Sequence, residues 1–296
     1  MIDTRRLAAA LMLGLLAGCA DKSADAPLAT RLQTPVAQYR TSQGPSGQDA
    51  HVPDFATRNF APFARQNAIA IALREWRLFG QPVDDDDPEQ RPDASSTAVK
   101  PERLPGLWER VGEYWWIGQD PYEAEVAWTG KHDSDGAPFD YVHDGRFAWS
   151  AAFISYVMRI AGAGDRFAYA PNHSTYINAA VSGTATALRA QDPALYAPQS
   201  GDLICAGRGH ARSLRFANLP TTGGFPAHCG IVVGRQPNQI SIIGGNVDDA
   251  VALTHVPVGP TGLLAGPDGQ SLDSRYSWLT VLEVLYDADA ESPLRD

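Results

Sequence analysis

The spacing of apolar residues predicts three helices in this chain. Apolar side chains recur every three or four residues within 63–79, 107–116 and 149–162, which is the period of a helix with one buried face. Gly80 directly follows the first segment and is expected to end that helix as a C-terminal cap. The segment from residue 172 onward is expected to open a further helix.

Short apolar runs next to turn residues predict strands in the second half of the chain. These runs occupy residues 198–205, 227–234, 240–247 and 281–286. The second run opens with a histidine, and the third ends in a Gly-Gly-Asn corner at residues 244–246. The aromatic cluster of the 107–116 helix fits a buried core better than a sugar-stacking platform, although the pattern allows both.

The N-terminus predicts export. Two arginines precede the apolar run 7–17, which is shorter than the roughly 20 residues that span a membrane. Leu-Ala-Gly-Cys at 16–19 resembles the bacterial lipobox, which implies removal of residues 1–18 and lipidation of Cys19. The alternative is an ordinary secretory signal with an incidental cysteine. Since Ala20 and not aspartate follows, we expect a periplasm-facing lipoprotein of the bacterial cell envelope, at the outer rather than the inner membrane.

Composition delimits the folded region and its partners. Residues 19–60 have the composition of a flexible tether, and residues 287–296 are expected to fray. A formal net charge of −10 without a basic stripe argues against nucleic acid as a partner. The spacings typical of zinc, calcium and phosphate-loop sites are missing. The acidic run 84–89 and the segment 132–136 are therefore interpreted as loops, and neither a metal nor a cofactor is expected.

Ser150 is the first candidate for chemistry. It lies at the start of the predicted 149–162 helix, where unpaired backbone amides and the helix dipole stabilise an anion. Such a position suits a nucleophile. It also suits a simple N-cap, since serine is a preferred cap residue.

Four motifs together resemble those of the papain-like NlpC-type peptidases and the CHAP amidases. They are Trp-Ser-Ala-Ala-Phe at 149–153, Gly-Asp-Leu at 201–203, His-Cys-Gly-Ile at 228–231 and Gly-Gly-Asn at 244–246. Over residues 61–286 the chain more closely resembles the bacterial family called domain of unknown function 2272. This resemblance implies an α+β papain-like domain, with helices packed on a central antiparallel sheet of five or six strands.

The resemblance also implies roles for three residues. Ser150 occupies the position of the cysteine nucleophile in these families. His228 occupies the position of the catalytic base, and Asn246 that of the residue that orients the base. Asp248 or Asp249 is the alternative third member. The implied activity is cleavage of an amide in peptidoglycan or a related envelope peptide, or acyl transfer to an amine. The alternative is a non-catalytic module that binds such a peptide, because the thiol is missing.

Four further residues are expected at the substrate: Trp149, His173, Arg146 and Arg208. The resemblance to the uncharacterised family suggests that His173 lines the cleft. The alternative makes it a surface residue beside a helix capped by Asn172 or Ser174. The two arginines could bind substrate carboxylates in bidentate fashion, or be ordinary surface residues.

Cys205 and Cys229 fall in predicted core strands that are neighbours in the resembling families. They are expected either to form a disulfide in an oxidising compartment or to be two small buried hydrophobic residues. Neither lies at a helix N-terminus that would activate a thiol. Because side chains alternate along a strand, Cys229 should face the core if His228 faces the cleft.

Overall fold

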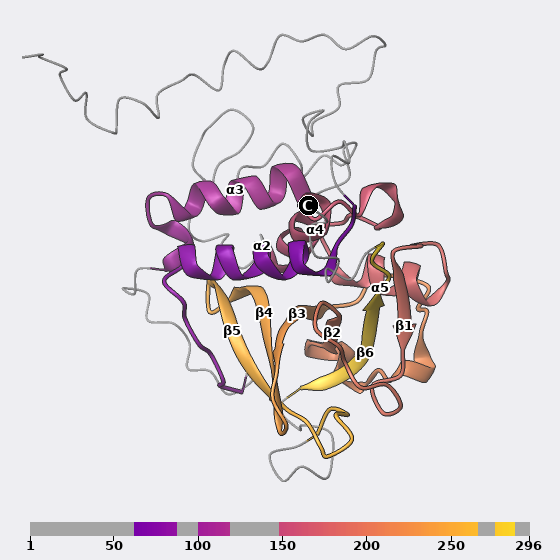
Figure 1. Cartoon of the computed structure of the whole chain (residues 1–296). Helices are drawn as coiled ribbons and strands as arrows, with labels where there is room; N and C mark the ends of the chain where they lie inside the picture. Colours follow the sequence, from indigo (N-terminus) through magenta and orange to yellow (C-terminus); the bar gives the residue numbers. More distant parts are fainter. Residues whose placement is uncertain (1–61, 88–99, 119–147, 266–275, 288–296) are drawn as a thin grey trace, which may run out of the picture. The chain divides into compact units, whose positions relative to one another are not determined.

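A computed structural model describes residues 62–87, 100–118, 148–265 and 276–287. These residues form an α+β fold, with helices packed over an open, fully antiparallel sheet of six strands (Figure 1). The expected α+β class and the expected sheet size are confirmed. Cys19, Arg146, the tether and residues 288–296 lie outside the described residues. None of the described helices is long and apolar enough to cross a membrane.

The strand order across the sheet is β1-β6-β2-β3-β4-β5. Four strands confirm the predicted runs, although β2 begins later and β6 earlier than expected. β1 and β5 were missed, because β1 is only four residues long and β5 is a buried run without polar alternation. The bounds are Leu188–Gln191 (β1), Leu203–Gly207 (β2), Ala227–Arg235 (β3), Gln239–Val247 (β4), Ala250–Pro257 (β5) and Ser277–Val284 (β6).

The described helices include all those that the sequence predicts. They are α2 (Arg65–Leu78), α3 (Leu107–Gly118), α4 (Ser150–Ile160) and α5 (His173–Val181). Gly80 ends α2 with φ of +84°, and its amide donates to the carbonyl of Arg77. This left-handed cap is the one predicted, since glycine adopts positive φ without steric cost.

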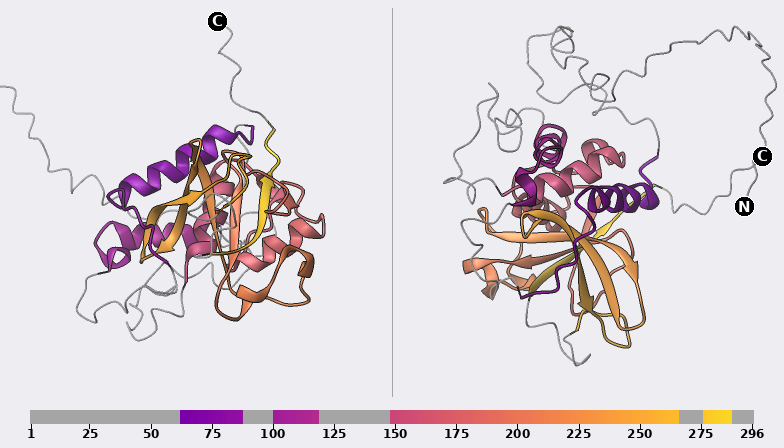
Figure 2. Two further views of the ribbon diagram at one scale, coloured as in Figure 1. Left: turned by 90° about the horizontal axis from the view of Figure 1, so that it is seen from below. Right: turned by 90° about the vertical axis from the view of Figure 1, so that its left-hand side faces the viewer.

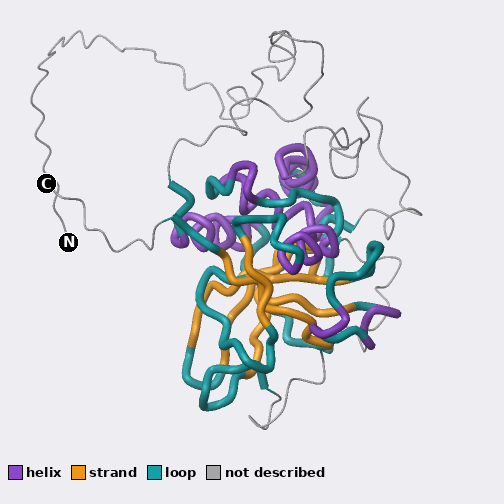
Figure 3. Tube along the Cα trace, turned by 90° about the vertical axis from the view of Figure 1, so that its right-hand side faces the viewer, coloured by secondary structure: helices purple, strands orange, loops and turns teal. Residues whose placement is uncertain are grey.

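Apolar side chains fill both faces of the sheet. The larger core lies between the sheet and the helices, which occupy one side of it in Figures 2 and 3. The smaller core covers the opposite face around Ile204, Val232 and Trp278. Tyr114 and Trp115 of α3 are buried in the larger core, so the aromatic cluster of this helix is mainly core.

Cys205 and Cys229 form a disulfide between facing positions of β2 and β3. Both are fully buried on the helix side of the sheet. His228, the next residue, lines a pocket together with Ile204 of the smaller core. The expected alternation between His228 and Cys229 is therefore observed.

The Gly-Gly corner of β4 allows two close approaches. A β-carbon on Gly245 would lie 2.8 Å from the indole of Trp149, and one on Gly244 would lie 2.7 Å from Nε2 of His228. Contacts this short would displace α4 and His228. The two glycines therefore bring the start of α4 and the histidine of β3 against the same strand.

Candidate active site

Ser150 is the first residue of α4 and not its N-cap. The N-cap is Trp149, whose side chain makes no capping hydrogen bond, and the amide of Phe153 donates to the Trp149 carbonyl at 3.0 Å. The interpretation of Ser150 as a simple cap is wrong. Its hydroxyl is instead available for side-chain interactions at the amino end of the helix. Ser150 is 8 % exposed.

The Ser150 hydroxyl contacts a histidine from another helix. Ser150 Oγ lies 2.7 Å from Nε2 of His173, the first residue of α5. Asn172 fixes this end of α5, because its side chain accepts the amide of Thr175 at 3.1 Å. Capping by Asn172 is thus confirmed. The surface interpretation of His173 is wrong, since only 3 % of this residue is exposed.

Tyr176 completes a line of three buried polar side chains, Ser150, His173 and Tyr176, which we call the serine line. Its hydroxyl is hydrogen-bonded to Nδ1 of His173, one turn earlier on α5. Burial lowers the pKa of His173 well below its ordinary value, and the charges of His228 and Arg208 lower it further. Burial raises the pKa of the Tyr176 hydroxyl. At neutral pH the line is therefore an alcohol, a neutral imidazole and a phenol.

The tautomer of His173 decides what this line can do. If Nδ1–H donates to the Tyr176 oxygen, Nε2 carries the lone pair and accepts the Ser150 proton. If the tyrosine donates to Nδ1, Nε2–H donates to Ser150 and cannot act as a base. The heavy-atom geometry accommodates both tautomers.

His228 lies beside this line. Its ring centroid is 5.5 Å from that of His173, at an interplanar angle of 60°. In the part of the chain that the structure describes, the hydrogen bond of Ser150 goes to His173, and none joins Ser150 to His228. One imidazole is therefore bonded to the serine, and the second packs against the first.

Asn246 occupies a strained backbone position on β4. Its φ is +56°, at the point where the β4–β5 pairing shifts register between Gly244 and Val247. Asparagine tolerates this conformation better than most residues, which gives Asn246 a conformational role in the bulge. Among the described contacts, none joins the Asn246 amide to His228.

The two aspartates after Asn246 form the β4–β5 turn. Asp248 and Asp249 have φ of +48° and +58°, as a two-residue type I′ turn requires. Asp248 is exposed, whereas the Asp249 carboxylate lies 2.8 Å from the Lys100 ammonium. The described contacts of these carboxylates thus involve the turn and Lys100, and no histidine.

Trp149 anchors the amino end of α4. Its side chain is fully buried, and its indole N–H donates to Oε2 of Glu102 at 2.6 Å. Such burial leaves no surface for the substrate contact expected of Trp149. Glu102 is only 2 % exposed, and its amide donates to the Asp249 carbonyl. Sequence reasoning missed Glu102, which lies in a short segment without periodicity.

Asp202 of the Gly-Asp-Leu motif has a structural role. Its carboxylate accepts the amides of Gln199 and Val284, at 2.8 and 3.2 Å, and the hydroxyl of Tyr196 at 3.1 Å. These contacts tie the turn before β2 to β6. Burial raises the pKa of Asp202 to about 6.

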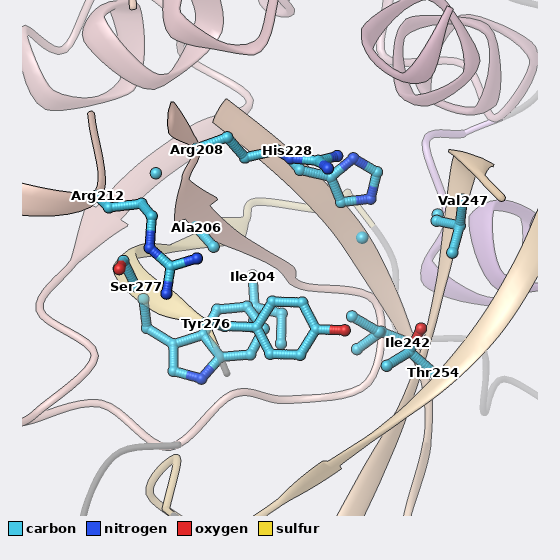
Figure 4. Close-up of a pocket in the computed structure, with 14 residues that line it drawn as sticks. Ile204, Ala206, Arg208, Arg212, His228, Ile242, Val247, Thr254, Tyr276 and Ser277 are labelled. Atoms are coloured by element: carbon cyan, nitrogen blue, oxygen red, sulfur yellow. The ribbon is translucent and has the colours of Figure 1, made fainter. Parts of the chain in front are cut away.

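A pocket opens on the far side of His228 (Figure 4). Arg208 and Arg212 line it, together with aromatic residues of β6 and the segment before it. Arg208 therefore lies near the serine site, as expected, and Arg212 was missed. In the described residues, no group of three or more His, Cys, Asp or Glu side chains is placed to hold a metal.

Fold and site define an α+β protein with a serine bonded to a buried histidine at a helix N-terminus. The chain belongs to the bacterial family described as "Uncharacterized protein conserved in bacteria (DUF2272)", whose model matches residues 102–284. No curated protein matched the chain. No solved structure matched it either.

Proposed function

We propose that this protein is an amide hydrolase of the bacterial cell envelope, with Ser150 as its nucleophile. The observation that carries the proposal is the 2.7 Å contact between Ser150 Oγ and His173 Nε2 at the start of α4. A serine hydroxyl becomes a nucleophile when a base accepts its proton during attack. The first-turn amides of a helix can stabilise the oxyanion that results.

The proposed reaction has two stages. Ser150 Oγ attacks the substrate carbonyl while its proton passes to Nε2 of His173, and the same nitrogen then protonates the leaving amine. Water next attacks the acyl group on Ser150 and delivers a proton to His173, which returns it to Ser150 Oγ as the acid is released. An amine in place of water would give acyl transfer.

His173 is our first choice for the base. The resemblance to NlpC-type and CHAP enzymes favours His228 in this role, with Asn246 orienting it. The described hydrogen bond favours His173 instead, oriented by Tyr176. In this arrangement His228 lies between the serine line and the pocket, where it contacts the substrate.

Peptidoglycan or a related envelope peptide is the proposed substrate. Support comes from the resemblance of four motifs to those of peptidoglycan-cleaving families, and from the resemblance of residues 16–19 to a lipobox. A lipid on that cysteine would hold the domain at a membrane surface without spanning it.

One observation favours a second function, a catalytically silent peptide-binding module. The partner of His173 is a phenol with a raised pKa and not a carboxylate. A phenol orients the imidazole but does not offset the positive charge that develops on it, so turnover would be slow or absent.

A fluorophosphonate probe, which reacts with activated serines, separates the two functions. We expect the full chain to be labelled at Ser150, and expect Ser150→Ala and His173→Ala to abolish labelling. Ser155→Ala is the matched control, because Ser155 is buried in the same helix and contacts the Ala170 backbone. His228→Ala tests the alternative base: loss of labelling in His228→Ala but not in His173→Ala would assign the base to His228.

Incubation with peptidoglycan sacculi then identifies the bond by mass spectrometry. Cleavage that requires Ser150 would establish the hydrolase. If the wild-type protein does not cleave sacculi but Ser150→Cys does, the cleft is intact and lacks only the cysteine thiol. Sacculi that are bound but never cut, with no probe labelling, would favour the binding module.

A further inference from the structure

We infer that the pocket beside His228 is a subsite for a carboxylate group of the substrate. The inference rests on the proposed function, since it assigns this hydrolase to acidic peptides. It draws on the position of the pocket, its two arginines and a buried donor without a partner.

The pocket adjoins the serine line through one residue. His228 lines the pocket, and its ring also packs against His173, which holds Ser150. A ligand in the pocket therefore touches the ring that packs against His173, and the rings of His228 and His173 separate it from the reacting hydroxyl. The pocket encloses about 40 Å³, room for two or three water molecules. That volume suits one small polar group, while the rest of the ligand extends toward Ser150.

Two arginines give the pocket its charge. Arg208 precedes the short helix Gly209–Ser213, Arg212 lies within it, and both line the pocket (Figure 4). The backbone fixes both, because the Arg208 amide donates to the Pro226 carbonyl at 3.0 Å, and Gly207 lets the Ala211 carbonyl pack directly on β2. Guanidinium groups placed in this way bind carboxylates through paired hydrogen bonds.

Trp278 supplies the independent observation. It lines the same pocket and is 5 % exposed, and its indole N–H is buried with no hydrogen-bond partner among the described residues. Its ring stacks on Tyr276, with centroids 4.7 Å apart. A buried donor without a partner is rare and indicates a missing acceptor. Trp278 thus gives the pocket wall an unsatisfied donor, and its indole signal reports occupancy of the pocket.

The test is binding to the full chain carrying Ser150→Ala, so that turnover plays no part. The protein carries ¹⁵N-labelled tryptophan, and the indole signal of Trp278 is assigned with Trp278→Phe. Four probes are titrated: acetyl-Ala-Ala, its C-terminal amide, acetyl-glutamate amide and inorganic phosphate. The first carries a terminal carboxylate and the third a side-chain carboxylate, so their relative affinity identifies the source of the group.

We expect both carboxylate probes to shift the Trp278 signal, and the neutral amide to bind at least about tenfold more weakly. Arg212→Gln and Arg208→Gln should each weaken the carboxylate probes by about tenfold. Arg189→Gln, which removes the same charge from an arginine with a 61 % exposed side chain on β1, should change binding by less than about twofold.

Equal binding of acid and amide, or unchanged binding in both arginine variants, would overturn the inference. Phosphate binding as tight as that of the carboxylates would replace it with a phosphate site. Failure of the proposed function has a different signature: the carboxylate probes would still bind, while the wild-type chain would not react with the fluorophosphonate.

Discussion

Two buried polar clusters differ in how their charges are balanced. The first surrounds Glu75 of α2, which is fully buried and accepts hydrogen bonds from two arginines and two tyrosines. The second is the line of Ser150, His173 and Tyr176. The donors to Glu75 are Arg74, Arg110, Tyr114 and Tyr156, which come from α2, α3 and α4.

The charged cluster around Glu75 is suited to stabilising the fold, whereas the neutral cluster at Ser150 is suited to chemistry. The Glu75 carboxylate has acceptor capacity for all its donors and joins three helices into one layer, so no lone pair is left for a substrate. The second line contains no formal charge, ends at a hydroxyl on a helix N-terminus and lies beside a pocket. A neutral imidazole with a lowered pKa can accept a proton, which a saturated ion cluster cannot.

The sharpest test exchanges one residue of each cluster. Ser150→Ala should lower the rate of fluorophosphonate labelling at least about a thousandfold, because the reacting atom is gone. Its free energy of unfolding should change by only about 1 kcal/mol, since one neutral hydrogen bond is lost. Labelling and urea unfolding measured together check both expectations. Unchanged labelling would end the assignment of Ser150 as nucleophile.

Glu75→Gln should have the reverse effect. It leaves Arg110 and Arg74 without their shared carboxylate, which should lower the free energy of unfolding by about 3 kcal/mol. Glu113→Gln is the control, because its 43 % exposed carboxylate pairs with the same Arg110 and should cost under about 1 kcal/mol. Thermal unfolding measures both. The folded Glu75→Gln protein should still be labelled at Ser150.

Asp202 is a buried carboxylate held by neutral donors, and it should make stability depend on pH. Burial raises its pKa from the ordinary 3.8 to about 6, so the folded state binds this proton more tightly. The Asp202 contribution is therefore greatest below pH 4, and about 2 to 3 kcal/mol is lost as pH rises to 6. Urea unfolding at pH 4 to 7 should show this slope reduced in Asp202→Asn. The exposed Asp165→Asn should behave like wild type.

The lowered pKa of His173 gives its contribution to stability a pH dependence opposite to that of Asp202. It also predicts that labelling continues at acidic pH. A buried neutral imidazole becomes charged more easily in the unfolded chain, so stability falls as pH drops below 6.5. Labelling should nevertheless persist below pH 6.5, because His173 still lacks its proton there. Tyr176→Phe should slow labelling about tenfold by releasing Nδ1. A labelling rate that falls as pH drops through 6.5 would contradict His173 as the base.

Asn246 gives the smallest effect and separates strain from chemistry. Asn246→Ala should lower the free energy of unfolding by about 1 kcal/mol, because alanine resists positive φ. Asn246→Gly should be nearly neutral in stability. If the amide takes part in chemistry, both variants label slowly. Normal labelling in the glycine variant would leave Asn246 with its conformational role alone.

Local patterns predicted the parts of this fold that depend on neighbours along the chain. The helix periodicity of 149–162 placed Ser150 within the first turn of α4, and Gly80 ended α2 as expected. β5 escaped prediction, because a continuously buried strand lacks the alternation that marks a half-exposed one. Its pairing with β4 comes from the turn at Asp248 and Asp249, residues whose positive φ is unusual outside glycine.

Contacts between distant segments account for most of what was missed. His173 approaches Ser150 because the amino ends of α4 and α5 meet, although the two residues are 23 positions apart in the sequence. Glu102 reaches Trp149 across 47 residues. Arg212 and Trp278 line one pocket although they are 66 positions apart in the sequence. None of these pairs has a spacing that a periodic pattern could reveal.

The sequence by itself determined the helices, four of the strands and the serine at a helix start. These follow from residue type and spacing, which act over a few positions. Only the tertiary structure decided which histidine holds Ser150, what fixes Trp149 and which arginines share a pocket. Such contacts depend on how whole elements pack, and packing is set by the combined shape of two cores and not by any one segment.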